Sequence, residues 1–110
     1  MGRSKKEGEE KIMSYQLIIR EEAEQDFQEA YNWYEAQRGG LGDEFTLSLD
    51  ACMSSIIRNP NIYQSKYKGV RIGLTRRFPF GIYYFVINKR IIVIGILHIS
   101  RNPKIWKTRK

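Results

Sequence analysis

Two neighbouring side chains near the end of the chain are the clearest candidates for chemistry. His98 is the only histidine of the sequence, and Arg101 follows it closely. An imidazole exchanges protons near neutral pH and a guanidinium binds phosphate, so the pair suits general acid–base chemistry or a phosphate contact. A histidine that is simply hydrogen-bonded at the rim of a sheet explains the same residue, and the sequence leaves both interpretations open.

A set of cations extends this candidate site. Arg71 is expected to project from a strand on the side away from Val70 and Ile72, and Arg76 and Arg77 come at the end of that strand. The other members of the set are Lys66, Lys68, Lys104, Lys107 and Arg109. Together they predict a basic surface for an anionic partner, either a nucleic acid or an acidic protein segment. A solvated surface without a partner is the alternative.

Aromatic residues are interleaved with these cations. Tyr84 is expected on the strand face opposite Tyr83 and Phe85, so one of the two sets packs on the helices. A tyrosine hydroxyl beside arginines either serves RNA chemistry or satisfies an internal hydrogen bond. Trp106 lies in the basic tail, where a helical turn that begins at Pro103 is expected to dock it.

The charges of the chain are divided sharply along its length. All twelve acidic residues lie at or before Asp50, and residues 51–110 contain thirteen lysines and arginines. The basic half therefore has no carboxylate with which to hold a metal, and one cysteine with one histidine cannot build a structural zinc site. No metal and no cofactor is expected, so any catalysis would be metal-independent.

The cellular setting follows from the same composition. The single cysteine, Cys52, cannot form an internal disulfide, which fits the reducing cytoplasm. The longest apolar run, residues 91–99, is far shorter than the roughly twenty residues that span a bilayer. We therefore expect a cytoplasmic protein that does not contact the membrane.

The hydrophobic pattern predicts the elements that position these residues. Residues 1–13 are charged and are expected to be a disordered leader or an over-long start, with Met13 as an alternative initiator, and residues 14–110 are expected to form a single domain. Strands are expected at 15–20, 69–75, 82–87 and 91–99, and two helices at 21–38 and about 43–58. Leu41-Gly42 is expected to form the turn between the helices, with Asp43 or its neighbours as the cap. The order β-α-α-β-β-β predicts a two-layer α+β domain with a helical hairpin packed on a curved antiparallel sheet.

Four segments carry a resemblance to a known family. They are YQLIIREEAEQDFQEAYNWYE, GLGDEFTLSLDACMSSIIRNP, VRIGLTRRFPFGIYYFV and IIVIGILHISRNPKIWKTR, of which the RRFPFGIYY block and the HISRNPKIW ending are the most specific. In order and spacing they resemble the RelE/ParE superfamily of bacterial toxins from type II toxin–antitoxin modules. The resemblance covers roughly residues 14–109, and it implies the same β-α-α-β-β-β fold.

The resemblance also implies a biological role. The chain is expected to be a growth-inhibiting toxin that its cognate antitoxin neutralises in a hetero-oligomer. Such antitoxins commonly wrap an extended acidic segment around the toxin, which suits the basic half of this chain. The binding surface is then expected to include Arg76, Lys104, Trp106, Lys107 and Arg109.

The family contains two activities, and both remain candidates. RelE-like members cleave messenger RNA on the ribosome without a metal, for which Arg71, Arg77, His98, Arg101 and Tyr84 are the catalytic candidates. ParE-like members inhibit DNA gyrase and have no known chemistry of their own. The chain has only two lysines, Lys66 and Lys68, shortly before Arg71, and it has no terminal tyrosine. It therefore resembles the ParE-like or plasmid-stabilisation branch slightly more than the RelE-like branch. A non-toxic nucleic-acid-binding domain is a weaker third hypothesis.

Overall fold

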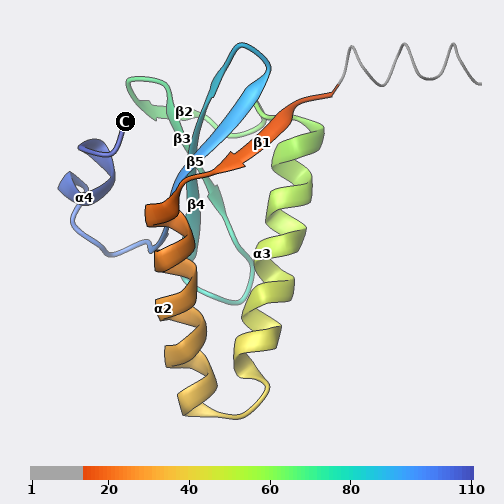
Figure 1. Ribbon diagram of the computed structural model, residues 1–110, viewed down its shortest axis with the longest axis vertical. Helices are drawn as coiled ribbons and strands as arrows, with labels where there is room; N and C mark the ends of the chain where they lie inside the picture. Colours follow the sequence, from red (N-terminus) through yellow and green to blue (C-terminus); the bar gives the residue numbers. More distant parts are fainter. Residues whose placement is uncertain (1–13) are drawn as a thin grey trace, which may run out of the picture.

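The protein folds into a five-stranded sheet with a helical hairpin on one face, as a computed structural model of the chain shows (Figure 1). The structure describes residues 14–110, so the expected leader and the choice between Met1 and Met13 lie outside the described residues. The elements are β1 (Gln16–Ile19), α2 (Glu21–Gln37), α3 (Leu41–Arg58), β2 (Ser65–Tyr67), β3 (Val70–Leu74), β4 (Phe80–Ile87), β5 (Arg90–His98) and α4 (Lys104–Lys107). This architecture confirms the expected two-layer α+β fold.

The sheet differs from the expected antiparallel sheet at both of its edges. β3, β4 and β5 pair antiparallel as expected, and the full strand order is β1-β5-β4-β3-β2. β1 pairs with β5 in parallel, an arrangement that needs a long connection, which the helical hairpin and the strands β2, β3 and β4 supply. The short strand β2, which pairs with β3, was not predicted. The sheet is therefore mixed.

The turn between the two helices lies at earlier residues than the sequence pattern predicted. α3 begins at Leu41, after Gly40 at φ +91°, a left-handed conformation that glycine adopts without strain. The Glu35 carboxylate accepts hydrogen bonds from the backbone amides of Gly40 and Gly42, both at 2.9 Å. Asp43 instead accepts a hydrogen bond from the Tyr31 hydroxyl at 3.0 Å. The expected cap at Asp43 is therefore wrong, because a carboxylate from the preceding helix already satisfies the free amides.

Both faces of the sheet are covered. The face toward α2 and α3 packs a core that includes Phe45, Ile56 and Tyr84. The opposite face packs Tyr83, Phe85 and Trp106, and α4 lies on that side, apart from the hairpin (Figure 1). The expectation that Tyr84 lies opposite Tyr83 and Phe85 is confirmed.

A β-bulge in β5 changes which way its last residues face. Tyr83 pairs with Gly95 and Tyr84 pairs with Val93, so Ile94 is an extra residue on β5. Beyond the bulge, Ile96 joins Val93 on the helix side while Ile94 lies on the other face. His98 follows Ile96 and lines a cavity against α2. Simple alternation along residues 91–99 would place His98 on the same face as Ile94, and the extra residue prevents this.

Candidate functional site

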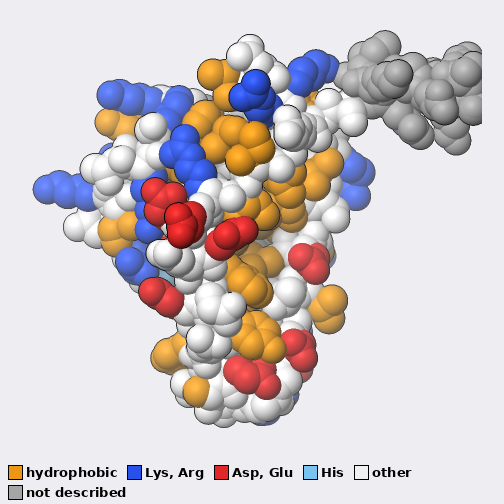
Figure 2. All heavy atoms as spheres, in the orientation of Figure 1, with side chains coloured by type: hydrophobic (Ala, Val, Ile, Leu, Met, Phe, Trp, Pro, Cys, Tyr) orange, Lys and Arg blue, Asp and Glu red, His pale blue; other side chains and the backbone are white. Residues whose placement is uncertain are grey.

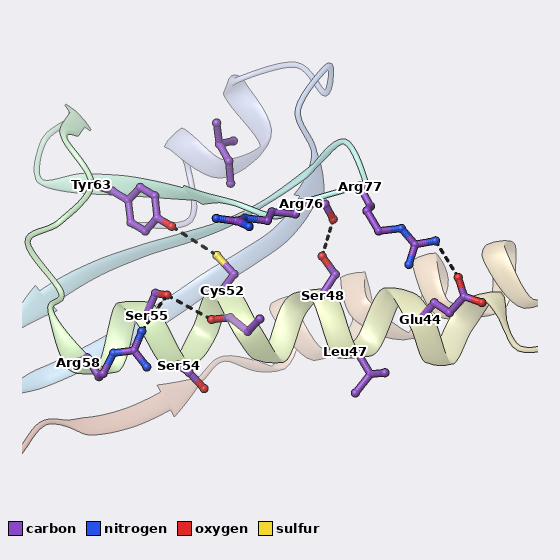
Figure 3. Close-up of a pocket in the computed structure, with 12 residues that line it drawn as sticks. Glu44, Leu47, Ser48, Cys52, Ser54, Ser55, Arg58, Tyr63, Arg76 and Arg77 are labelled. Atoms are coloured by element: carbon purple, nitrogen blue, oxygen red, sulfur yellow. Dashed lines mark hydrogen bonds and ion pairs between the residues drawn. The ribbon is translucent and has the colours of Figure 1, made fainter.

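A groove of about 640 Å³ lies between α3 and the end of β3 (Figure 3). Its walls come from one side of α3, from Tyr63, and from the segment that follows β3. The lining residues are Glu44, Leu47, Ser48, Ala51, Cys52, Ser54, Ser55, Arg58, Tyr63, Leu74, Arg76 and Arg77. Three arginines and one acidic residue are among them, so the groove is predominantly cationic.

Local contacts hold the cationic wall of the groove in place. The Ser48 hydroxyl on α3 donates a hydrogen bond to the Arg76 carbonyl at 2.6 Å, which fixes the loop against the helix (Figure 3). Arg77 adopts φ +73°, and its guanidinium lies 5.3 Å from the centre of the Phe78 ring. The Thr75 hydroxyl closes the turn through a 2.8 Å hydrogen bond to the Phe78 carbonyl. The backbone therefore presents Arg76 and Arg77 from a structured loop.

One carboxylate balances part of this charge. Glu44 accepts a 2.8 Å hydrogen bond from Arg77 and lies 3.3 Å from the Arg38 guanidinium. The hydrogen bond from Arg77 is the main cause that lowers the pKa of Glu44 below its ordinary value. Arg76 has a different surrounding, because its guanidinium extends over the groove toward Tyr63 (Figure 3).

The rim of the groove is apolar as well as cationic. Leu47 on α3 is 69% exposed and Leu74 on β3 is 57% exposed. At the floor, the Cys52 sulfur lies 4.0 Å from the Tyr63 hydroxyl. Burial raises the pKa of both groups, so Cys52 stays a protonated thiol rather than a nucleophile.

A second, smaller cavity of about 170 Å³ contains His98 and Arg101. His98 and Arg101 line it together with Asp26 and Glu29 of α2. The His98 Nδ1 accepts a 3.1 Å hydrogen bond from the backbone amide of Ser100, which assigns the proton of the neutral ring to Nε2. No sequence signal distinguished Asp26 and Glu29 from the other acids of the same helix.

Arg71 and Tyr84 lie in a third place, within the helix-facing side of the sheet. They are cross-strand partners on β3 and β4, and Arg71 donates a hydrogen bond to the Tyr63 carbonyl. Tyr84 is fully buried, and its hydroxyl donates to the Pro60 carbonyl at 2.6 Å. Burial raises the pKa of Tyr84 to about 12. This corrects the expectation that Tyr84 could serve as a catalytic group, because its hydroxyl is enclosed and already engaged.

Two of the expected binding residues instead attach the C-terminal segment to the domain. We call residues 104–110 the C-terminal latch. Trp106 is buried with its ring 5.3 Å from that of Tyr83. Arg109 forms a 2.6 Å ion pair with Asp26 and donates to the Ile94 carbonyl at 2.9 Å. Trp106 and Arg109 are therefore structural, whereas Lys104 and Lys107 are exposed.

The expected catalytic residues thus do not form one cluster. Arg77 lines the groove, His98 and Arg101 line the small cavity, and Arg71 is half-buried beside Tyr84 on the sheet. Residues 14–110 contain no group of three or more histidines, cysteines or acids that could hold a metal ion. Within the same range, no helix is both long enough and apolar enough to cross a bilayer.

The protein is a small α+β domain with a predominantly cationic groove. A family model described as the ParE toxin of the type II toxin–antitoxin system parDE matches residues 17–103. The chain therefore belongs to the ParE toxin family, within the RelE/ParE superfamily.

A solved structure supports the same fold. It is titled "Chromosomal ParDE TA system from P. aeruginosa" and superposes with a TM-score of 0.70 at 20% sequence identity. The match covers 78% of this chain and 97% of the other. A search of curated protein sequences finds no match.

Proposed function

We propose that this chain is the toxin of a type II toxin–antitoxin module and that it arrests growth in the cytoplasm by binding DNA gyrase. The observation that carries the gyrase reading is the separation of the five catalytic candidates into three places. Metal-free RNA cleavage needs a base, an acid and a cation around one phosphate. A toxin that acts by binding needs only a complementary surface.

The cognate antitoxin is the partner that neutralises this surface. Its expected acidic segment complements the basic half of the chain, and the resulting complex is a toxin–antitoxin hetero-oligomer. The exposed cations Arg76, Lys104 and Lys107 are proposed contacts in that complex. Charge complementarity of this kind increases the association rate and the specificity of the pair.

Metal-independent cleavage of messenger RNA is the second candidate function. The observation in its favour is the small cavity, where His98, Arg101 and Glu29 lie together. An imidazole, a guanidinium and a carboxylate can between them transfer protons and hold a phosphate. In this case His98 and Arg101 would be the essential residues. Arg71 does not line the cavity, so it would contribute only by holding the structure of the sheet.

Induced expression without the antitoxin tests both functions in one experiment. We expect growth arrest, a DNA damage response, and inhibition of gyrase supercoiling by the purified protein. His98→Ala and Arg101→Ala should retain these effects, whereas Arg76→Ala combined with Arg77→Ala should reduce them. New messenger 5′ ends that disappear with His98→Ala would instead identify the endoribonuclease, and harmless expression would remove both toxin readings.

A further inference from the structure

The groove between α3 and β3 has a composition that selects one kind of partner. Arg58, Arg76 and Arg77 supply positive charge along its length. The exposed apolar groups at its rim are the leucines Leu47 and Leu74, which pack on aliphatic side chains rather than stack on bases. A partner that satisfies both features is a protein segment that carries carboxylates and leucine-like side chains.

We infer that this groove binds an acidic, leucine-bearing protein segment and that Glu44 competes with that segment from within the toxin. In the free protein the Glu44 carboxylate forms an ion pair with the Arg77 guanidinium. In the complex a carboxylate of the partner replaces Glu44 in that ion pair. The inference rests on the proposed function in one respect, since the antitoxin is the partner that would supply the segment. Glu44 then sets the affinity and selectivity of neutralisation.

The position of Glu44 suits this competition. It is the one acidic residue among the residues that line the groove, and its carboxylate contacts two arginines. Oε1 accepts from Arg77 at 2.8 Å, and Arg38 reaches both oxygens at 3.3–3.4 Å. Both ion pairs are exposed, so they can exchange without any rearrangement of the core. Of these two arginines only Arg77 lines the groove, so it is the guanidinium that a partner carboxylate in the groove would contact.

The geometry of Arg77 keeps the guanidinium available after the exchange. Its backbone is fixed in a turn that Thr75 and Ser48 close through hydrogen bonds to loop carbonyls. Its guanidinium also lies over the Phe78 ring, a contact that does not involve Glu44. Release of Glu44 therefore leaves a positioned cation at the mouth of the groove rather than a mobile side chain.

Peptide binding to three forms of the toxin tests the inference. The probe is a short fluorescent peptide of glutamate and leucine, and the control probe has glutamine in place of glutamate. We expect Glu44→Gln to bind the acidic probe about two- to fivefold more tightly, the range of an exposed ion pair. Asp50→Asn is the matched control, because Asp50 lies on the same helix but lines a different groove. It should give a clearly smaller gain.

A double variant and a second ligand sharpen the test. In the Arg77→Gln background the gain from Glu44→Gln should be clearly smaller, because Arg77 is no longer there to be released and only the longer contact with Arg38 remains. Equal gains for Glu44→Gln and Asp50→Asn would reduce the effect to net charge and overturn the inference. A larger gain for a single-stranded RNA probe than for the peptide would also overturn it, because the groove would then bind nucleic acid.

The result is separable from the proposed function. Growth arrest tests whether the chain is a toxin, whereas the peptide titration needs neither gyrase nor antitoxin. A non-toxic chain with a Glu44-dependent gain would lose the proposed function and keep the groove as a peptide site. A toxic chain with no such gain would show the reverse. Unchanged thermal unfolding of Glu44→Gln confirms that any gain reflects binding.

Discussion

The C-terminal latch and the groove between α3 and β3 use the same residue type in opposite ways. In the latch, the Arg109 and Asp26 side chains are 18% and 11% exposed. In the groove, the side chains of the Arg77 and Glu44 pair are 63% and 35% exposed. The first pair is enclosed by the fold and the second faces solvent, so a cation in the sequence is a binding residue only where the fold leaves it accessible.

The two sides of α3 repeat this contrast at the level of whole surfaces. The groove toward β3 is rimmed by arginines, whereas a groove of about 460 Å³ toward α2 is lined by Phe27, Leu49 and Met53 with Glu24 and Asp50 beside them. Apolar side chains form a band between the two helices, with acidic side chains next to it (Figure 2). One helix therefore separates a basic groove from a mainly apolar groove that has acidic residues beside it.

The latch should respond most strongly to loss of its aromatic anchor. Trp106→Ala removes the side chain that covers Tyr83 on the outer face of the sheet, and large aromatic truncations in a core cost about 3–5 kcal/mol. Urea denaturation followed by circular dichroism measures the loss. Lys104→Ala in the same turn is the control and should change stability by less than about 0.5 kcal/mol. A loss for Trp106→Ala as small as that for Lys104→Ala would mean that the latch does not stabilise the domain.

The ion pair of the latch should give the next largest effect. Asp26→Ala leaves the Arg109 guanidinium without its carboxylate and the Ile96 amide without its acceptor, at a cost of about 3 kcal/mol. Glu29→Ala, one turn along the exposed side of α2, should be nearly neutral in the same urea titration. Addition of Arg109→Met to Asp26→Ala should restore part of the stability, and a purely additive result would contradict a coupled pair.

The buried hydroxyl of Tyr84 should give a moderate effect that depends on pH. Tyr84→Phe removes the hydrogen bond to the Pro60 carbonyl and should cost about 1–2 kcal/mol at neutral pH. The pKa of Tyr84 is raised from 10.0 to about 12, so its contribution is fully present below pH 10 and is lost as pH rises toward 12. Wild type should therefore lose more stability than the variant across that interval, and parallel stability curves would contradict the assignment.

The groove should be the least sensitive of these regions to loss of a cation. Arg76→Ala removes an exposed side chain and should change the free energy of unfolding by less than about 0.5 kcal/mol. The same variant should weaken binding of the acidic peptide, as measured by fluorescence anisotropy. If Arg76→Ala destabilised the fold as strongly as Asp26→Ala does, the contrast between the latch and the groove would not hold.

Much of the fold could be predicted because its signals are local. Hydrophobic period, together with the Gly39-Gly40 and Asn59-Pro60 interruptions, located both helices and the three long strands. β2 was missed because three residues, SKY, carry no usable period. The role of Glu35 was missed because a cap supplied by the preceding helix depends on tertiary structure. Gly95 was the available hint of the bulge, since a glycine inside a strand often marks one.

The candidate site was less predictable because its partners lie far apart in the sequence. Arg77 meets Glu44 across 33 residues, and Arg109 meets Asp26 across 83. Residue type alone could not tell which arginine would be enclosed. The same limit applies to Tyr84 and Trp106, whose side chains pack inward, and to the cavity that unites His98 with acids of α2.

The pairing of β1 with β5 has a consequence for folding during translation. Among the described strands, the first to be synthesised has the last as its only neighbour in the sheet. The helical hairpin can form early from local contacts, but the edge strand must wait until residue 98 has left the ribosome. A chain still under translation therefore lacks the pairing of β1 with β5, and the full five-strand order exists only after β5 has been made.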